Sequence, residues 1–122
     1  MNRTFFAEKR AGLLVPVFAL RRDGDFGIGD TRAVREAVDF CHAEGFSVLQ
    51  TLPIHETIGD HSPYNAVSSV ALSPALLELS EQAVPGLVAA ECVAAAPEPW
   101  LARLRQGPVK HGSVQPLKRH IL

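Results

Sequence analysis

The chain has 122 residues, of which 47% are hydrophobic and 20% charged, and its formal net charge at pH 7 is -1. That length suffices for one small domain with a real core, and the composition is typical of a soluble globular protein. A charge so close to zero gives no reason to expect a nucleic acid or an anionic membrane as a partner. No apolar run approaches the roughly 20 residues of a membrane span, and charges interrupt the amino-terminal segment where a signal peptide needs an apolar block. We therefore expect a cytoplasmic protein.

The first predicted element is a strand. Residues 11–20 form a continuous apolar run, AGLLVPVFAL, which fits a strand buried on both faces. Pro16 cannot donate a ladder hydrogen bond, so the strand is expected at about residues 12–15. The segment 21–30, RRDGDFGIGD, is predicted to be a loop. It lacks the spacing of the phosphate-binding P-loop, and the dinucleotide-binding motif is also absent.

The clearest helix is predicted from Thr31 to Glu44. Apolar residues recur there along one stripe, at Val34, Ala37, Val38 and Cys41. Asp30 or Thr31 can cap its start, and Gly45 is a natural C-cap. The chain then enters a second apolar run, residues 46–54, which is predicted to be the next strand. Strand, helix and strand together form a βαβ unit of the length that a right-handed crossover needs.

Two polar loops follow the two predicted strands. In parallel sheets ligands gather at the carboxyl ends of the strands, so loops 21–30 and 55–69 are expected at the same end. The second loop is rich in neutral hydrogen-bonding groups, namely Ser62, Tyr64, Asn65, Ser68 and Ser69. Such a set suits a hydroxyl-rich ligand such as a sugar. An ordinary turn is the alternative interpretation, because Ser-Pro, Asp and Asn are common turn residues.

The charged and sulfur-bearing residues do not select a reactive centre. The segment 55–61, HETIGDH, has two histidines and two acids but is not the HExxH pattern on a helix, so we predict no metal site. Cys41 and Cys92 are too few for a disulfide framework. A glycosidase pair could be drawn from Asp23, Asp25, Asp30, Glu56 and Asp60. Nothing in the spacing of these acids picks out a pair, and loop acids are usually solvated. The residues alone predict a ligand-binding loop, no cofactor and no catalytic machinery.

The last third of the chain gives weaker signals. A short helix can start at Pro74 within the apolar run 70–79. We expect an irregular excursion with short helical pieces at 81–99, one more turn at Leu101–Leu104, a loop at 105–116, and the first turns of a helix at Pro116–Leu122.

Four segments of the chain carry a family resemblance. They are RAGLLVPVFALR, FGIGD, FCHAEGFSVLQTLPI and GDHSPYNAVSSVALSPALLEL, in that order. Together they resemble the amino-terminal part of the 4-alpha-glucanotransferases of glycoside hydrolase family 77, also called amylomaltases or disproportionating enzymes. The likeness covers about residues 10–80. It returns in VKHGSVQPLKRHIL, which is similar to the family's stretch before its helical insertion.

The resemblance implies a fold. The family has a (β/α)8 barrel with helical insertions, and such barrels need roughly 250 residues. The chain is then an α/β piece: residues 1–80 form the first βαβ part of the catalytic barrel, and residues 81–122 begin an insertion that is partly irregular. The rest of the barrel is expected downstream in the same polypeptide.

The resemblance also implies a function. The family transfers segments of α-1,4-glucan between maltooligosaccharides, with retention. By its pattern the catalytic Asp nucleophile, Glu acid/base and second Asp come from later strands, beyond Leu122. No catalytic residue is therefore assigned here, and the chain alone is expected to be inactive. Ser62 and Tyr64 match the SPY segment that faces the donor-side sugar subsites, and Asp60 matches the acid that commonly precedes it.

Two other interpretations compete with an enzyme fragment. The chain could be a free-standing, non-catalytic glucan-binding or regulatory module that keeps the SPYN loop. It could also be a different small α/β protein whose likeness is accidental. A reading frame that continues for several hundred residues after Leu122 would favour the fragment, and a stop codon there would favour the module.

Overall fold

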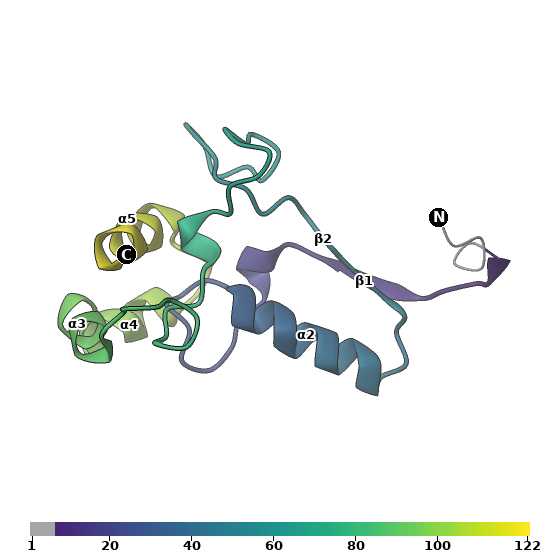
Figure 1. The fold of residues 1–122 in the computed structure, drawn as a ribbon, viewed down its shortest axis with the longest axis horizontal. Coiled ribbons are helices and arrows are strands. Elements are labelled where there is room, and N and C mark those ends of the chain that lie inside the picture. The colour runs from purple at the N-terminus through teal and green to yellow at the C-terminus, as the bar shows by residue number, and fades with distance from the viewer. Residues whose placement is uncertain (1–6) are drawn as a thin grey trace.

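A computed structural model describes residues 7–122, so the first six residues of the expected barrel piece, 1–80, lie outside the described residues. The elements follow in the order β1 (Gly12–Val15), the 3-10 turn η1 (Val17–Ala19), α2 (Thr31–Ala43), β2 (Val48–Thr51), the 3-10 turn η2 (Pro74–Leu76), α3 (Ala89–Ala95), α4 (Glu98–Arg105) and α5 (His111–Ile121). The sheet and α2 lie at one end of the molecule, and α3, α4 and α5 gather at the other (Figure 1). Between β2 and η2 the chain projects as a long loop.

The two strands pair in parallel, with Gly12 opposite Val48 and Val15 opposite Thr51. Helix α2 connects them, so the predicted βαβ unit and the α/β class are confirmed. The first strand has the predicted bounds. The second is shorter than its apolar run, because pairing with β1 spans four residues. Within residues 7–122 the sheet has these two strands, and its closure into a barrel stays an expectation.

Capping interactions fix where helix α2 begins and where it ends. The Asp30 carboxylate accepts hydrogen bonds from the backbone amides of Arg32 and Ala33, at 3.1 and 3.0 Å. This is the predicted N-cap. Gly45 follows the helix with φ of 77°, a conformation that favours glycine. The amide of the next residue, Phe46, then donates to the carbonyl of Cys41 at 2.8 Å, so the predicted C-cap is confirmed as well.

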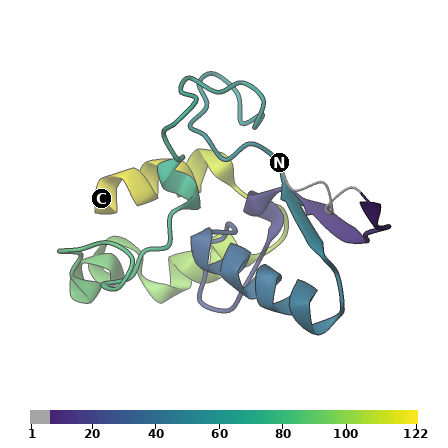
Figure 2. The ribbon, with the colours of Figure 1, turned by 45° about the vertical axis from the view of Figure 1, so that its right-hand side comes forward.

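The hydrophobic core lies beside the sheet, and helices from the last third of the chain complete it. Residues of η1, the loop 21–30, η2, α4 and α5 form it, and Figure 2 shows α5 and α4 with η2 beside them. Its buried members are Val17, Ile28, Ala75, Leu76, Ala96, Leu101, Leu104, Val114 and Leu117. The core therefore includes residues from both sides of position 80.

The expectation that the loop acids are solvated is wrong for Asp25 and Asp30, which are fully buried. Arg21 Nε donates to Asp25 Oδ2 at 2.6 Å, and Arg22 Nη2 donates to Asp30 Oδ2 at 2.8 Å. Asp25 also accepts from the backbone amide of Gly27 at 2.8 Å. Carboxylates can be buried when cations and amides replace their water. Sequence spacing could not show that α4 and α5 would cover this loop.

The carboxy-terminal region is more helical than expected. The predicted loop 105–116 is wrong from His111 onward, because α5 runs from His111 to Ile121 and contains Pro116. A proline inside a helix removes one hydrogen bond and normally breaks the helix. Here Val114 and Leu117 are buried in the core, and their packing outweighs that cost. The turn expected at Leu101–Leu104 is part of the longer helix α4.

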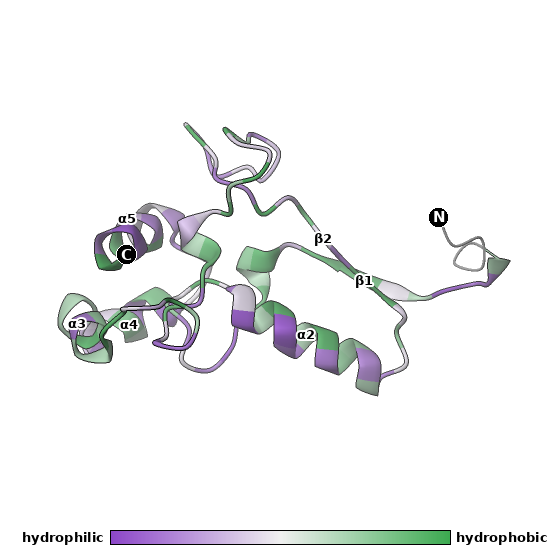
Figure 3. Ribbon diagram, in the orientation of Figure 1, coloured by the Kyte–Doolittle hydropathy of each residue, from purple (hydrophilic) through white to green (hydrophobic). Residues whose placement is uncertain are grey.

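The apolar stripe predicted for α2 is only partly covered. Cys41 is buried, as expected, whereas Val38 is 51% exposed. Phe40 and Leu14 are also more than half exposed, and they line a groove of about 430 Å³ between β1 and α2. The hydropathy colouring shows apolar segments on β1 and α2 at this end (Figure 3). None of the helices in residues 7–122 is long and apolar enough to cross a membrane.

We predict that the 122-residue chain alone self-associates through this groove, because an open apolar patch next to an unpaired strand edge invites contact. Sedimentation at several concentrations should give masses above the 13.2 kDa of one chain. Phe40→Glu should lower that association. Val93→Glu, at a 69% exposed site outside the groove, should leave it unchanged. A monomer with a sharp, cooperative thermal transition would contradict the prediction.

A second prediction concerns Asp25. Burial alone would raise the pKa of Asp25, but hydrogen bonds from Arg21 and from the amides of Arg22 and Gly27 outweigh it and lower the pKa. The stability from this group is therefore present above the pKa of an unfolded Asp and lost as pH falls through the lower folded pKa. Asp25→Asn should cost about 2 kcal/mol near neutral pH, since hydrogen bonds to charged groups contribute about 1.5–3 kcal/mol.

Urea unfolding followed by the fluorescence of Trp100, the single tryptophan, measures that cost at low protein concentration. The difference from the unmutated chain should shrink as the solution is acidified. Asp23→Asn is the matched control, because Asp23 is exposed and surface changes usually stay within about 0.5 kcal/mol. Equal losses for the two variants would show that the buried carboxylate is not what holds this loop.

Candidate functional site

The site loop, residues 55–72, projects from the carboxyl end of β2 (Figures 1 and 2). Two antiparallel bridges close its base, His55 with Leu72 and Thr57 with Ala66. The amide of Val67 donates to the carbonyl of Glu56 at 2.9 Å, inside the loop. These backbone contacts hold an exposed segment in a hairpin-like shape without a regular strand.

The tip of the site loop is shaped by its own polar groups. The backbone amide of Ser62 donates to Asp60 Oδ1 at 3.0 Å. The Asn65 amide nitrogen donates to the carbonyl of Ile58 at 3.1 Å, and the Asn65 backbone donates to the carbonyl of Ser62 at 3.1 Å. Asp60 and Asn65 therefore build a turn of the kind that Asx residues favour. The turn interpretation of this segment is confirmed, and its role as a ligand loop stays a prediction.

This turn leaves the side chain of Tyr64 exposed to solvent. Its side chain is 72% exposed, while Ser62, two residues earlier, is partly buried. Tyr64 lines an open hollow of about 360 Å³ together with His55, Ser68 and Ser69. A tyrosine ring presents a flat apolar face with a polar tip. The structure thus brings Asp60, Ser62 and Tyr64 into one turn beside an open hollow, although Asp60 Oδ1 is already occupied within that turn.

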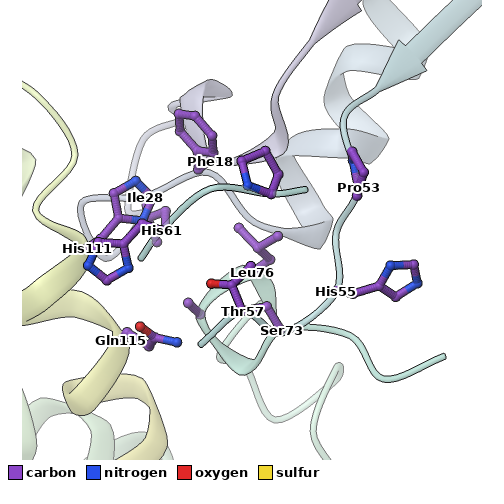
Figure 4. A pocket seen from close by; sticks show the side chains of 12 residues that line it. Phe18, Ile28, Pro53, His55, Thr57, His61, Ser73, Leu76, His111 and Gln115 are labelled. Atoms are coloured by element: carbon purple, nitrogen blue, oxygen red, sulfur yellow. The ribbon is translucent and has the colours of Figure 1, made fainter. Parts of the chain in front are cut away.

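A second, smaller pocket of about 40 Å³ lies on the inner side of the site loop, against the body of the molecule (Figure 4). Its walls come from the site loop, η1, η2, the loop 21–30 and α5, with the lining residues His61, Pro63, Phe18, Leu76, Ile28 and His111 among them. Ile28 from the loop 21–30 and His61 from the site loop line this same pocket, so both polar loops lie at one end, as predicted. The acids Asp25 and Asp30 do not line it, and they pair with Arg21 and Arg22.

Two histidines stack in this inner pocket. The rings of His61 and His111 are 4.9 Å apart between centroids and 14° from parallel. Phe18 meets His111 edge-on, at 5.1 Å and 74°. Burial, and then the neighbouring His61, lower the pKa of His111 below 6.5. The pocket therefore favours the neutral form of the His111 ring. Sequence reasoning missed His111, because it lies in a stretch predicted to be loop and no spacing relates it to His61.

The acids and histidines of segment 55–61 separate in the structure. Glu56 pairs with Arg119 of α5, and His55 lies across the pocket from the two stacked rings (Figure 4). Within residues 7–122 no group of three or more His, Cys, Asp or Glu side chains is placed to hold a metal ion. The arrangement instead offers hydroxyl groups and one exposed aromatic face, which can bind a neutral polar ligand.

Several curated proteins with similar sequences are named 4-alpha-glucanotransferase. The protein from Chlamydia pneumoniae is 42% identical over 69 residues, covering 57% of this chain and 13% of the relative. The protein from Chlamydia trachomatis is 43% identical over 74 residues, covering 61% and 14%. In Oryza sativa subsp. japonica, 4-alpha-glucanotransferase DPE2 is 35% identical over 83 residues, covering 62% and 9%.

The chain thus matches only about a tenth to a seventh of the length of these relatives. No solved structure matches it. The family model described as 4-alpha-glucanotransferase matches residues 15–122, a range that includes β2, the site loop and α5. An accidental likeness is therefore excluded, and the chain belongs to the 4-alpha-glucanotransferase family, glycoside hydrolase family 77.

Proposed function

We propose that this chain is the amino-terminal part of a 4-alpha-glucanotransferase whose (β/α)8 barrel is completed by later residues of the same polypeptide. The family match over residues 15–122 carries this proposal. Two features of the fold support it. Parallel strands are normally buried on both faces, yet β1 and β2 have no element across one side within residues 7–122. The groove between β1 and α2 leaves Leu14 and Phe40 open to a further packing partner.

The proposed substrates are maltooligosaccharides and longer α-1,4-glucans. The names of the relatives support a glucan as the transferred group. The exposed ring of Tyr64 fits against the apolar face of a sugar, and its hydroxyl can hydrogen-bond a sugar oxygen. In this proposal Ser62 supplies a second hydroxyl, and Asp60 holds the turn that presents both. The hollow beside Tyr64 is the donor-side subsite.

The proposed reaction is a double displacement with retention. A carboxylate attacks the anomeric carbon while a second carboxylic acid protonates the departing glycosidic oxygen, which gives a covalent glycosyl-enzyme. The 4-hydroxyl of another sugar then attacks the same carbon and displaces the carboxylate, while the acid that was deprotonated in the first step takes the hydroxyl proton. We assign both carboxyl groups to residues beyond Leu122. This assignment is supported by Asp25, Asp30 and Glu56, which are already paired with arginines.

The role of Tyr64 can be tested in the longest natural polypeptide that carries this sequence, meaning the complete translated product that contains these 122 residues. Tyr64→Phe should lower kcat/KM for maltotriose by roughly ten- to a hundred-fold, because a buried partner left without its hydrogen bond costs about 1–3 kcal/mol. Tyr64→Ala should lower it further, since the stacking surface is lost as well. The melting temperature of Tyr64→Phe should stay nearly unchanged, because the side chain is exposed.

Val70→Ala is the matched control on the same loop, at a residue 89% exposed, and it should change neither quantity. Kinetic parameters and melting temperature are measured on the same samples. Unchanged kinetics for Tyr64→Phe, or kinetics that fall only in step with stability, would remove Tyr64 from the subsite.

A further prediction concerns the 122-residue chain by itself. Without the downstream carboxyl groups it cannot form a glycosyl-enzyme, so it should not convert maltotriose into glucose and longer glucans. The assay needs protein from a host that lacks its own glucanotransferase. Activity in such a sample would overturn the placement of the catalytic residues. A chain that ends at Leu122 in the cell and binds maltooligosaccharides would favour the glucan-binding module.

A further inference from the structure

Two contacts between distant parts of the chain fasten the site loop to α5. His61 stacks on His111 with 4.9 Å between ring centroids, and the Glu56 carboxylate pairs with Arg119, 63 residues later. One contact lies at the tip of the loop and the other near its base. On α5, His111 lies in the first turn and Arg119 in the last. The two ends of the helix therefore contact two different parts of the site loop.

The tip contact connects directly to Tyr64. His61 and Pro63 line the inner pocket, whereas Tyr64 lines the outer hollow. The segment between them is stiff, because proline fixes its own φ and restricts the residue before it. The hydrogen bond from the Asn65 amide to the Ser62 carbonyl closes the same turn at 3.1 Å. A movement of His61 away from His111 therefore moves Tyr64 with it.

We propose that His61 and His111 are positioning residues for the glucan subsite, and that they form a clasp with Glu56 and Arg119 that opens the site loop when His111 is protonated. This inference rests on the proposed function for the role of Tyr64. The clasp itself rests on the ring stack and the ion pair alone.

The direction of the pH effect follows from the surroundings of the stack. Burial and the neighbouring His61 both oppose a charge on His111, and the described residues that line the inner pocket include no carboxylate that could balance it. The pocket that holds the stack is also lined by His55 from the site loop, Gln115 from α5, Phe18 from η1, Ile28 from the loop 21–30, and Ser73 and Leu76 at η2. Asp60 precedes His61 and Lys110 precedes His111, but neither lines the pocket. Glu56 and Arg119, on the same two elements, are paired with each other.

The sign of the effect is set by His111. Its pKa is lowered in the closed loop from an ordinary value of 6.5, by burial and then by His61. The open loop therefore binds more protons at acidic pH. The clasp has its full stability above about pH 6.5 and loses it as the pH falls below that value.

The clasp can be measured by hydrogen exchange with mass spectrometry on the longest polypeptide that carries this sequence. After correction for the intrinsic effect of pH, amides of residues 56–68 should exchange about tenfold faster near pH 5 than near pH 7.5. His111→Phe keeps an aromatic ring but removes one titrating group, so it should abolish most of that difference. His61→Phe makes the same change at an exposed residue and should act alike even if the substitution in α5 disturbs folding.

Two more variants complete the test. His111→Ala should speed exchange of residues 56–68 at both pH values, because the stack is lost. His42→Phe removes an exposed histidine on α2 and should leave the pH difference intact. No pH difference in the unmutated protein, or an undiminished one in both phenylalanine variants, would overturn the clasp.

Kinetics then separate the clasp from the proposed function. The KM for maltotriose should rise about tenfold between pH 7.5 and pH 5 in the unmutated protein, and His111→Phe should reduce that rise. Loop opening with an unchanged KM in an active enzyme would overturn the positioning role. An inactive protein whose loop still opens with acid would instead contradict the proposed function and leave the clasp standing.

Discussion

The burial of two loop carboxylates is the constraint on which the rest of the structure depends. Asp25 and Asp30 lie in the segment 20–30 between η1 and α2, and both are fully buried. An unpaired carboxylate in such a place costs several kcal/mol. The loop can therefore be covered only when Arg21 and Arg22 bind these acids, at 2.6 and 2.8 Å. Once they do, Asp30 caps α2 and the loop presents Ile28 to the core.

The same cluster holds the helices that follow. Arg105 of α4 donates to the carbonyl of Asp25 at 2.7 Å. Gly27 lies so close to α4 that a Cβ there would sit 2.6 Å from the carbonyl oxygen of Leu104. Lys118 of α5 is fully buried, and its ammonium group donates to the carbonyl of Leu77 at 2.6 Å. Burial lowers the pKa of Lys118 to about 8. Helix α5 is thus fixed to η2 beside the charged cluster, and the site loop is fixed to α5.

Local rules were sufficient for the first half of the fold. Asp30 and Gly45 mark the ends of α2 in the sequence as they do in the structure, and Pro16 ends the first strand where expected. The grouping of Asp60, Ser62 and Tyr64 also follows from their adjacency. The rest depends on distant packing. The burial of Asp25 needs α4 to cover it, and His111 meets His61 only because the core residues Val114 and Leu117 keep α5 helical across Pro116.

The most direct test of this account is a crystal structure of the longest polypeptide that carries this sequence, with a maltooligosaccharide bound. The account predicts a glucose ring against the face of Tyr64, with the hydroxyl of Tyr64 or Ser62 within hydrogen-bond distance of a sugar oxygen. It also predicts β1 and β2 as neighbouring strands of a closed barrel. A sugar bound away from the site loop, or a sheet that stays open, would contradict it.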